Sequence, residues 1–226
     1  MATQVEIINL ALGHIAVAPI VTTTEATVAA KAVMRVWDTS RKECLRSHDW
    51  PFGTVVTTLT LNTTYATLTT SGLYAGEFIY AYDYPSNCVA MWVVYNENVV
   101  DKTKGDDFRV LYDPTNSQRV ILTDAIDALC EYTFDVTDTS FFDASFVKMF
   151  SYKIAADVCL ELTGNYELAN NMLNEYKFLS SEAERSSALE NNPNHIKEGT
   201  SSFIDARGGS DESLDYFDPN NTHPNG

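Results

Sequence analysis

A stripe of six apolar residues, each four positions after the one before, constrains the fold of this chain more than any other feature of its sequence. The stripe consists of Phe142, Phe146, Phe150, Ile154, Val158 and Leu162. Residues four apart lie on one face of an α-helix, so the spacing predicts a helix of about six turns from residue 140, ended by Gly164. We expect Phe146 and Phe150, together with Trp37 from an earlier helix, to be buried in a helical core.

Three other segments have the apolar spacing of a helix: residues 5–14, 25–47 and 166–189. The first follows Thr3 and contains Glu6, and the two residues fit a capping box that satisfies two backbone donors. This segment is apolar on nearly all sides, so its own fold or a neighbour must cover it. The last segment becomes polar in its later part, SSEAERSSALE, which we expect to extend beyond the core.

Between residues 53 and 138 the helical spacing disappears. The sequence there is rich in Thr, Val, Tyr and Leu, and turn residues separate short runs, a pattern typical of β-strands. The candidate strands span residues 54–61, 65–69, 77–82, 88–95, 107–112, 119–122 and 128–136. Because the connections between them are modest in length, these runs predict a compact antiparallel β-insert.

The order of these segments predicts an α+β fold: a helical bundle of about four helices, an antiparallel β-insert and an extended C-terminal tail. We divide the chain accordingly into four regions. An N-terminal helical pair spans 1–52, the β-rich insert spans 53–138, a C-terminal helical pair that completes the bundle spans 139–190, and a docking tail spans 191–226.

The docking tail has no periodicity, and its composition is too poor in apolar residues to offset the entropic cost of ordering. We expect it to be disordered in the free subunit and to become ordered on a partner. Its candidate partner-binding anchors are the isolated apolar residues Phe203, Ile204, Leu214, Tyr216 and Phe217. The simpler alternative is a dispensable chain end.

The chain is strongly acidic, with 31 Asp and Glu against 15 Lys and Arg and a net charge of −16. Phosphates are held by clustered Lys and Arg, so this balance argues against a protein that grips nucleic acid or an anionic membrane surface. The local exception is the segment 25–47, whose basic residues are Lys31, Arg35, Arg41, Lys42 and Arg46. These residues form either a solvated face or a contact surface for an acidic neighbour.

The cysteine pattern indicates a reducing compartment. Cys44, Cys88, Cys130 and Cys159 form no CxxC pair, have no histidine at a zinc-site spacing and are embedded in apolar sequence. We therefore predict buried free thiols. The N-terminus lacks the positive start of a signal peptide, and no stretch approaches the ~20 apolar residues of a membrane span, so we expect a cytoplasmic protein or part of a particle assembled there.

The sequence contains no GxSxG, HExxH, Walker or GxGxxG motif. His14 is expected at a helix end, and His48 and Asp49 are adjacent, which rarely gives the geometry of a catalytic pair. A glycosidase-like pair would have to come from carboxylates on or beside the β-insert, such as Glu77, Asp83 and Glu97. The tail has a weak, incomplete cation-binding pattern in Asp211, Glu212, Asp215 and Asp218. We predict no catalytic residue, no cofactor and no metal.

Four segments of the chain together resemble a known family. They are EIINLALGHIAVAPI at 6–20, HDWPF at 48–52, AYDYPSNCV at 81–89 and FVKMFSYKIAADVCLELTGN at 146–165. They look like the tail tubular proteins of short-tailed bacteriophages, the head-to-tail adaptors also called gatekeepers. The resemblance covers about residues 3–190 and includes no catalytic signature.

The resemblance implies a structural virion protein and not an enzyme. Such a subunit would assemble in the host cytoplasm as a twelvefold homo-oligomeric ring, bind the portal protein and join it to the tail nozzle protein. Viral DNA would leave through the central channel without sequence-specific binding, and an acidic lumen would keep it from sticking. No membrane partner is implied.

Two other functions fit the sequence less well. The first is a virion-associated peptidoglycan or glycan hydrolase with a secondary structural role, which degradation of peptidoglycan by the purified protein would reveal. The second is a host cytoplasmic binding module, which predicts a stable monomer with a small-molecule pocket.

Overall fold

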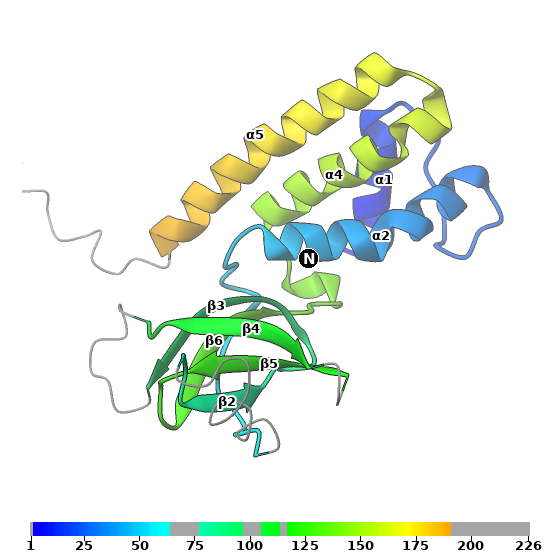
Figure 1. Cartoon of the computed structure of the whole chain (residues 1–226). Coiled ribbons are helices and arrows are strands. Elements are labelled where there is room, and N and C mark those ends of the chain that lie inside the picture. The colour runs from blue at the N-terminus through cyan, green and yellow to red at the C-terminus, as the bar shows by residue number, and fades with distance from the viewer. Residues whose placement is uncertain (1, 64–76, 97–104, 114–116, 191–226) are drawn as a thin grey trace, which may run out of the picture. The chain divides into compact units, whose positions relative to one another are not determined.

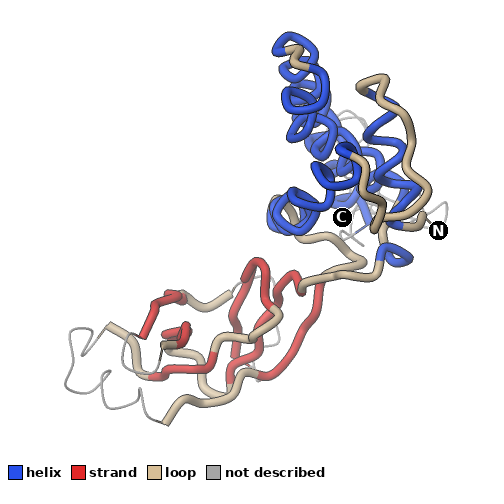
Figure 2. Tube along the Cα trace, turned by 90° about the vertical axis from the view of Figure 1, so that its right-hand side faces the viewer, coloured by secondary structure: helices blue, strands red, loops and turns tan. Residues whose placement is uncertain are grey.

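The computed structural model describes residues 2–63, 77–96, 105–113 and 117–190, with the backbone alone described for residues 186–190. These residues belong to one unit that spans Met1–Asn191. They form the predicted α+β fold, with four α-helices and two small antiparallel three-stranded sheets (Figure 1). Figure 2 shows the helices gathered in one group and the strands in another.

Side chains at the helix ends explain where the helices start and stop. The helices are α1 (Gln4–His14), α2 (Val28–Arg46), α4 (Ala144–Thr163) and α5 (Tyr166–Glu190). The predicted capping box of α1 is confirmed, because the Thr3 hydroxyl accepts the Glu6 N–H at 3.3 Å and the Glu6 carboxylate accepts the Thr3 N–H at 2.7 Å. Gly164 ends α4 with a φ of 67°, a left-handed conformation that glycine adopts without strain.

Two predicted helix starts were wrong by three or four residues. Helix α2 begins at Val28 and not at residue 25, because the Glu25 carboxylate accepts the backbone N–H groups of the preceding loop and Thr27 caps the helix instead. Helix α4 begins at Ala144, where Asp143 accepts the Phe146 N–H at 2.6 Å. The first residue of the apolar stripe, Phe142, therefore precedes the helix and follows a short 3-10 turn, Thr139–Phe141.

The helical core is built around α4, which contacts α1, α2 and α5. The prediction that Trp37, Phe146 and Phe150 are buried is confirmed, since none is more than 5% exposed. The later part of α5 was expected to extend beyond the core. This expectation was wrong for the helix up to Ala183, because that residue is buried at 3% exposure. Ala183 comes four residues after the buried Leu179, so it continues the apolar face by one more turn.

The strands form two separate sheets. Sheet β1–β6–β3 contains Thr54–Thr58, Ala128–Phe134 and Cys88–Asn96, and sheet β2–β5–β4 contains Tyr80–Asp83, Gln118–Thr123 and Phe108–Asp113. All the pairs are antiparallel, as predicted. The first strand is shorter than expected, since Leu61 forms only an isolated bridge with Tyr82. The candidate strand at 65–69 lies outside the described residues.

Aromatic side chains connect the chain after α2 to the start of α4. Trp50 and Phe52 of the HDWPF segment lie 5.1 and 5.0 Å from the ring of Phe146, and Phe52 lies 5.6 Å from Phe142. The indole N–H of Trp50 donates to the carbonyl of Cys44 at 2.9 Å, which satisfies the polar atom of this buried side chain. These contacts therefore fix the path of the chain from the end of α2 to the start of β1.

A buried ion pair also links α2 to the end of β6. Arg41 is 2% exposed, and its guanidinium donates to the carboxylate of Asp135 and, at 2.7 Å, to the carbonyl of Val136. Burial alone would raise the pKa of Asp135, but the hydrogen bond and charge of Arg41, helped by Lys42, outweigh it and hold that pKa below its ordinary value. The carboxylate is therefore ionised where it meets the buried arginine.

The prediction of four buried free thiols is confirmed for every cysteine in the chain. Burial raises the pKa of Cys88 and, to about 12, that of Cys130, so both thiols are protonated and unreactive near neutral pH. In the part of the chain that the structure describes, no helix combines the length and apolar character required to cross a membrane.

Candidate interaction sites

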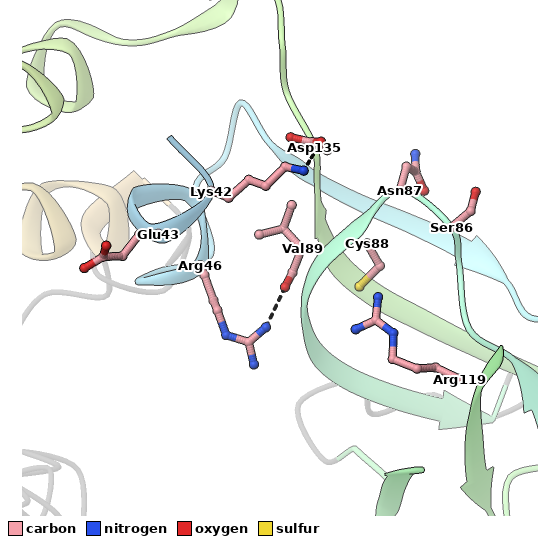
Figure 3. Close-up of a pocket in the computed structure, with 9 residues that line it drawn as sticks. All are labelled: Lys42, Glu43, Arg46, Ser86, Asn87, Cys88, Val89, Arg119 and Asp135. Carbon is pink, nitrogen blue, oxygen red and sulfur yellow. Dashed lines mark hydrogen bonds and ion pairs between the residues drawn. The ribbon is translucent and has the colours of Figure 1, made fainter. Parts of the chain in front are cut away.

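A polar pocket of about 470 Å³ lies beside the C-terminal turn of α2, the turn that leads into β3, and the start of β5 (Figure 3). Its cationic lining consists of Lys42, Arg46 and Arg119, and its carboxylates are Glu43 and Asp135. Residues 86–89 complete it with a hydroxyl, an amide, a thiol and the apolar side chain of Val89.

Both carboxylates of the polar pocket are already paired with cations. Asp135 binds Arg41 and lies 3.4 Å from the Lys42 ammonium group. Glu43 lies 3.0 Å from the ammonium group of Lys153. Each negative charge of the pocket is thus offset inside the fold.

The two arginines of the polar pocket are held by uncharged groups instead. Arg46 donates to the carbonyl of Val89 at 2.8 Å, and the Arg119 guanidinium lies 3.9 Å from the centre of the Tyr84 ring. Figure 3 shows Arg46 extending from α2 and Arg119 extending from β5, on the two sides of the Cys88–Val89 segment in this view. Among the described residues, neither forms an ion pair with a carboxylate.

Several other groups in or beside the pocket carry no charge. Burial and a hydrogen bond from the Cys88 thiol raise the pKa of Tyr84 to about 12. Asn87 accepts a hydrogen bond from the Tyr132 hydroxyl at 3.0 Å through its amide oxygen, which leaves its amide N–H groups as donors. The side of the pocket that Arg46 and Arg119 form is therefore electropositive, although the whole chain has a net charge of −16.

The basic residues of α2 do not form one uniform solvated face. That interpretation is wrong for Arg41, which is buried, whereas Arg35 is exposed and pairs with Glu161 at 3.0 Å. The acidic partners of these two arginines are Asp135 and Glu161, which lie about a hundred residues further along the chain. Charge spacing on one helix cannot reveal partners that only the tertiary fold brings near.

An apolar groove of about 340 Å³ lies between α1 and α4. Its apolar lining comes from Ala2, Leu10, Phe142, Ala144 and Val147, and its polar lining from His14, Lys148 and Ser151. Leu10 is 48% exposed although it lies on the most apolar helix of the chain. The groove therefore presents apolar surface to the outside of this unit.

His14 has the structural position expected of it at the end of α1. Its ring stacks on Tyr152 with centroids 3.8 Å apart, and its Nε2 lies 3.1 Å from the Ser151 hydroxyl. Burial, and to a lesser degree the charge of Lys148, lower the pKa of His14 below its ordinary value of 6.5. The folded protein therefore favours the neutral imidazole.

We expect His14 to make the fold less stable in mild acid. The unfolded chain takes up a proton as the pH falls through about 6.5, while the folded chain resists protonation until a lower pH, so folding stability decreases across that interval. Thermal unfolding measured from pH 7.5 to 5.5 should show a smaller loss for His14→Gln than for the natural protein. An equal loss in both proteins would contradict the assignment.

The other candidate residues have separate structural partners. His48 Nε2 lies 3.1 Å from Asp49 Oδ1, within ion-pair distance, but the arrangement does not meet hydrogen-bond geometry. Glu77 pairs with Arg109 at 3.0 Å, and Asp83 accepts the Asn62 amide at 2.6 Å. The remaining candidates lie outside the described residues: Glu97, Asp211, Glu212, Asp215, Asp218 and the tail anchors Phe203, Ile204, Leu214, Tyr216 and Phe217.

Within the described ranges, no group of three or more His, Cys, Asp or Glu side chains is placed to hold a metal ion. Sequence reasoning missed the polar pocket, whose residues come from four distant segments of the chain. Two signals touched it: the AYDYPSNCV segment contains the pocket residues 86–89, and the basic residues of 25–47 include Lys42 and Arg46. A scan against protein-family models and a search of curated proteins found no match to this chain.

Proposed function

We propose that this protein is a structural virion subunit, a ring-forming head-to-tail adaptor that links the portal to the tail nozzle of a bacteriophage. In this proposal the chain has no catalytic role and forms part of the channel through which DNA is ejected. The observation that carries the proposal is the exposed apolar groove between α1 and α4, which we assign as the contact surface for a neighbouring copy of the same chain.

Five of the eight residues that line the groove belong to two of the four segments on which the family resemblance rests. Leu10 and His14 belong to EIINLALGHIAVAPI, and Val147, Lys148 and Ser151 belong to FVKMFSYKIAADVCLELTGN. The resemblance therefore extends to surface positions as well as to core packing. Apolar side chains of a partner can cover an exposed groove of this kind and remove its surface from water.

Large exposed aromatic residues elsewhere on the helices support the same conclusion. Phe141 is 61% exposed, Tyr166 is 69% exposed and Phe178 is 63% exposed. Aromatic side chains are enriched in protein interfaces because they supply a large contact area with few rotatable bonds. A subunit that is surrounded by neighbours in a ring would cover surface of this type.

The overall charge suits a channel that DNA must traverse. At a net charge of −16 the chain repels the phosphate backbone, so DNA would not be retained during ejection. The tail at 191–226, with its predicted anchors, remains part of the proposal as a second point of attachment to the portal or to an adjacent subunit.

Assembly on a portal tests the proposal directly. We expect the purified protein, mixed with its candidate portal, to form rings that are visible by electron microscopy, with a twelvefold mass by native mass spectrometry. Leu10→Glu places a charge in the groove at an exposed position, so it should leave the fold intact and abolish ring formation. The matched control is Leu160→Glu, at 53% exposure on α4 and outside the groove lining.

Two results would overturn the proposal. One is a chain that stays monomeric with every portal tested, and the other is release of soluble fragments from peptidoglycan by the purified protein, which would favour the hydrolase. In the same assay, truncation after Leu189 tests the tail. Unchanged attachment of the truncated chain would show that the tail is dispensable.

A further inference from the structure

The polar pocket has an electrostatic character opposite to that of the chain around it. Within the described residues, other basic side chains such as Arg35, Arg41 and Arg109 are paired with carboxylates of the same chain. Arg46 and Arg119 are the cations that line the pocket without such a partner, and both are exposed. The fold thus presents two guanidinium groups to an open recess.

Both guanidinium groups are held in place before any ligand arrives. Arg46 donates one N–H to the Val89 carbonyl, and the Arg119 guanidinium stacks on the Tyr84 ring. The stacking leaves the N–H groups at the edge of the Arg119 guanidinium available to a ligand. Because their positions are fixed by these contacts, little side-chain entropy would be lost when they bind an anion.

The ligand that matches this arrangement carries carboxylates. A guanidinium binds a carboxylate through two parallel N–H donors, and the amide N–H groups of Asn87 and the hydroxyl of Ser86 add neutral donors beside it. Val89 contributes an apolar surface that a peptide can cover, and the volume of about 470 Å³ is enough for a few side chains. DNA is a poorer match, because the net charge of −16 repels a long polyanion.

We propose that this pocket binds an acidic peptide segment of a partner protein, with Arg46 and Arg119 receiving its carboxylates. Such a segment would bind whether or not the chain forms a ring, so the pocket and the proposed adaptor role can fail independently. The bound segment would contact α2, β3 and β5 together and would therefore also brace the helices against the strands.

Fluorescence anisotropy with a fluorescein-labelled hexaglutamate peptide tests this inference on the full chain at low ionic strength, where charge interactions are least screened. We expect saturable binding that Arg46→Gln/Arg119→Gln weakens by about tenfold or more, because two charge-assisted pairs are lost. Arg46→Lys/Arg119→Lys should retain part of the affinity. The matched control is Arg109→Gln, which removes the same charge from β4 outside the pocket and should bind as the natural protein does.

A second variant guards against misfolding. Asn87→Asp retains the oxygen that accepts the hydrogen bond of the Tyr132 hydroxyl and leaves both arginines in place. It adds a negative charge to the exposed lining of the pocket, so it should also weaken binding of the peptide. The inference is overturned if hexaglutamate does not saturate the natural protein, or if Arg109→Gln weakens binding as much as the pocket variants do. It is also overturned if free succinate or inorganic phosphate binds as tightly as the peptide, since the pocket would then be a small-anion site.

Discussion

Asp135→Ala should lower the free energy of unfolding by about 3–5 kcal/mol, because it leaves the buried guanidinium of Arg41 without its main counter-ion. Arg41 is 2% exposed, so its guanidinium has little contact with water in the folded chain, and the carbonyl of Val136 satisfies only part of it. The effect should be seen in the midpoint of urea or thermal unfolding of the purified chain.

Asp38→Ala is the matched control for this prediction. Asp38 also contacts Arg41, at 3.4 Å, but its side chain is 80% exposed, and exposed ion pairs contribute little, within about 1 kcal/mol. A second comparison replaces both buried partners by apolar residues, in Arg41→Met/Asp135→Leu, and this change should cost less than Asp135→Ala alone. A stability loss below about 1 kcal/mol for Asp135→Ala would show that Arg41 is not held as described.

Phe146→Ala should also cost about 3–5 kcal/mol, because it removes a fully buried ring and leaves a cavity at the junction of the helices and the aromatic segment. Trp50, Phe52 and Phe142 all pack against this ring, with centroids 4.7 to 5.1 Å away. Truncation therefore removes several contacts at once, and their loss should appear as a lower unfolding midpoint.

Phe141→Ala makes the same chemical change five residues earlier, at a side chain that is 61% exposed. We expect it to alter the stability of the isolated chain by no more than about 0.5 kcal/mol. Equal losses at the two positions would mean that the register of α4 is wrong. The contrast between the two variants thus tests both the burial of the apolar stripe and the helix start at Ala144.

Local patterns in the sequence were sufficient to predict the elements of the fold. The spacing around Phe146 and Phe150 determines which face of α4 is buried, and the pair Thr3 and Glu6 determines where α1 begins. The alternation of short apolar runs and turns indicated antiparallel strands. These signals are reliable because they depend on interactions between residues a few positions apart, whose geometry the backbone fixes.

Local competition for backbone donors explains the errors at helix starts. Glu25 has the helix-forming character that extended the predicted segment to residue 25, but its carboxylate binds the N–H groups of the loop at residues 21 and 22. Phe142 belongs to the apolar stripe by spacing, yet Asp143 caps the helix after it. In both cases a carboxylate that accepts backbone N–H groups outweighed the helix propensity of the segment.

The sequence by itself determined the helices, most of the strands, the buried aromatic core and the free thiols of this protein. Only the tertiary structure decided that the strands divide into two sheets, that Arg41 pairs with Asp135, and that Arg46 and Arg119 share one pocket with residues 86–89. Those arrangements join residues up to about a hundred positions apart. Their partners are chosen by the packing of whole elements, which no local spacing encodes.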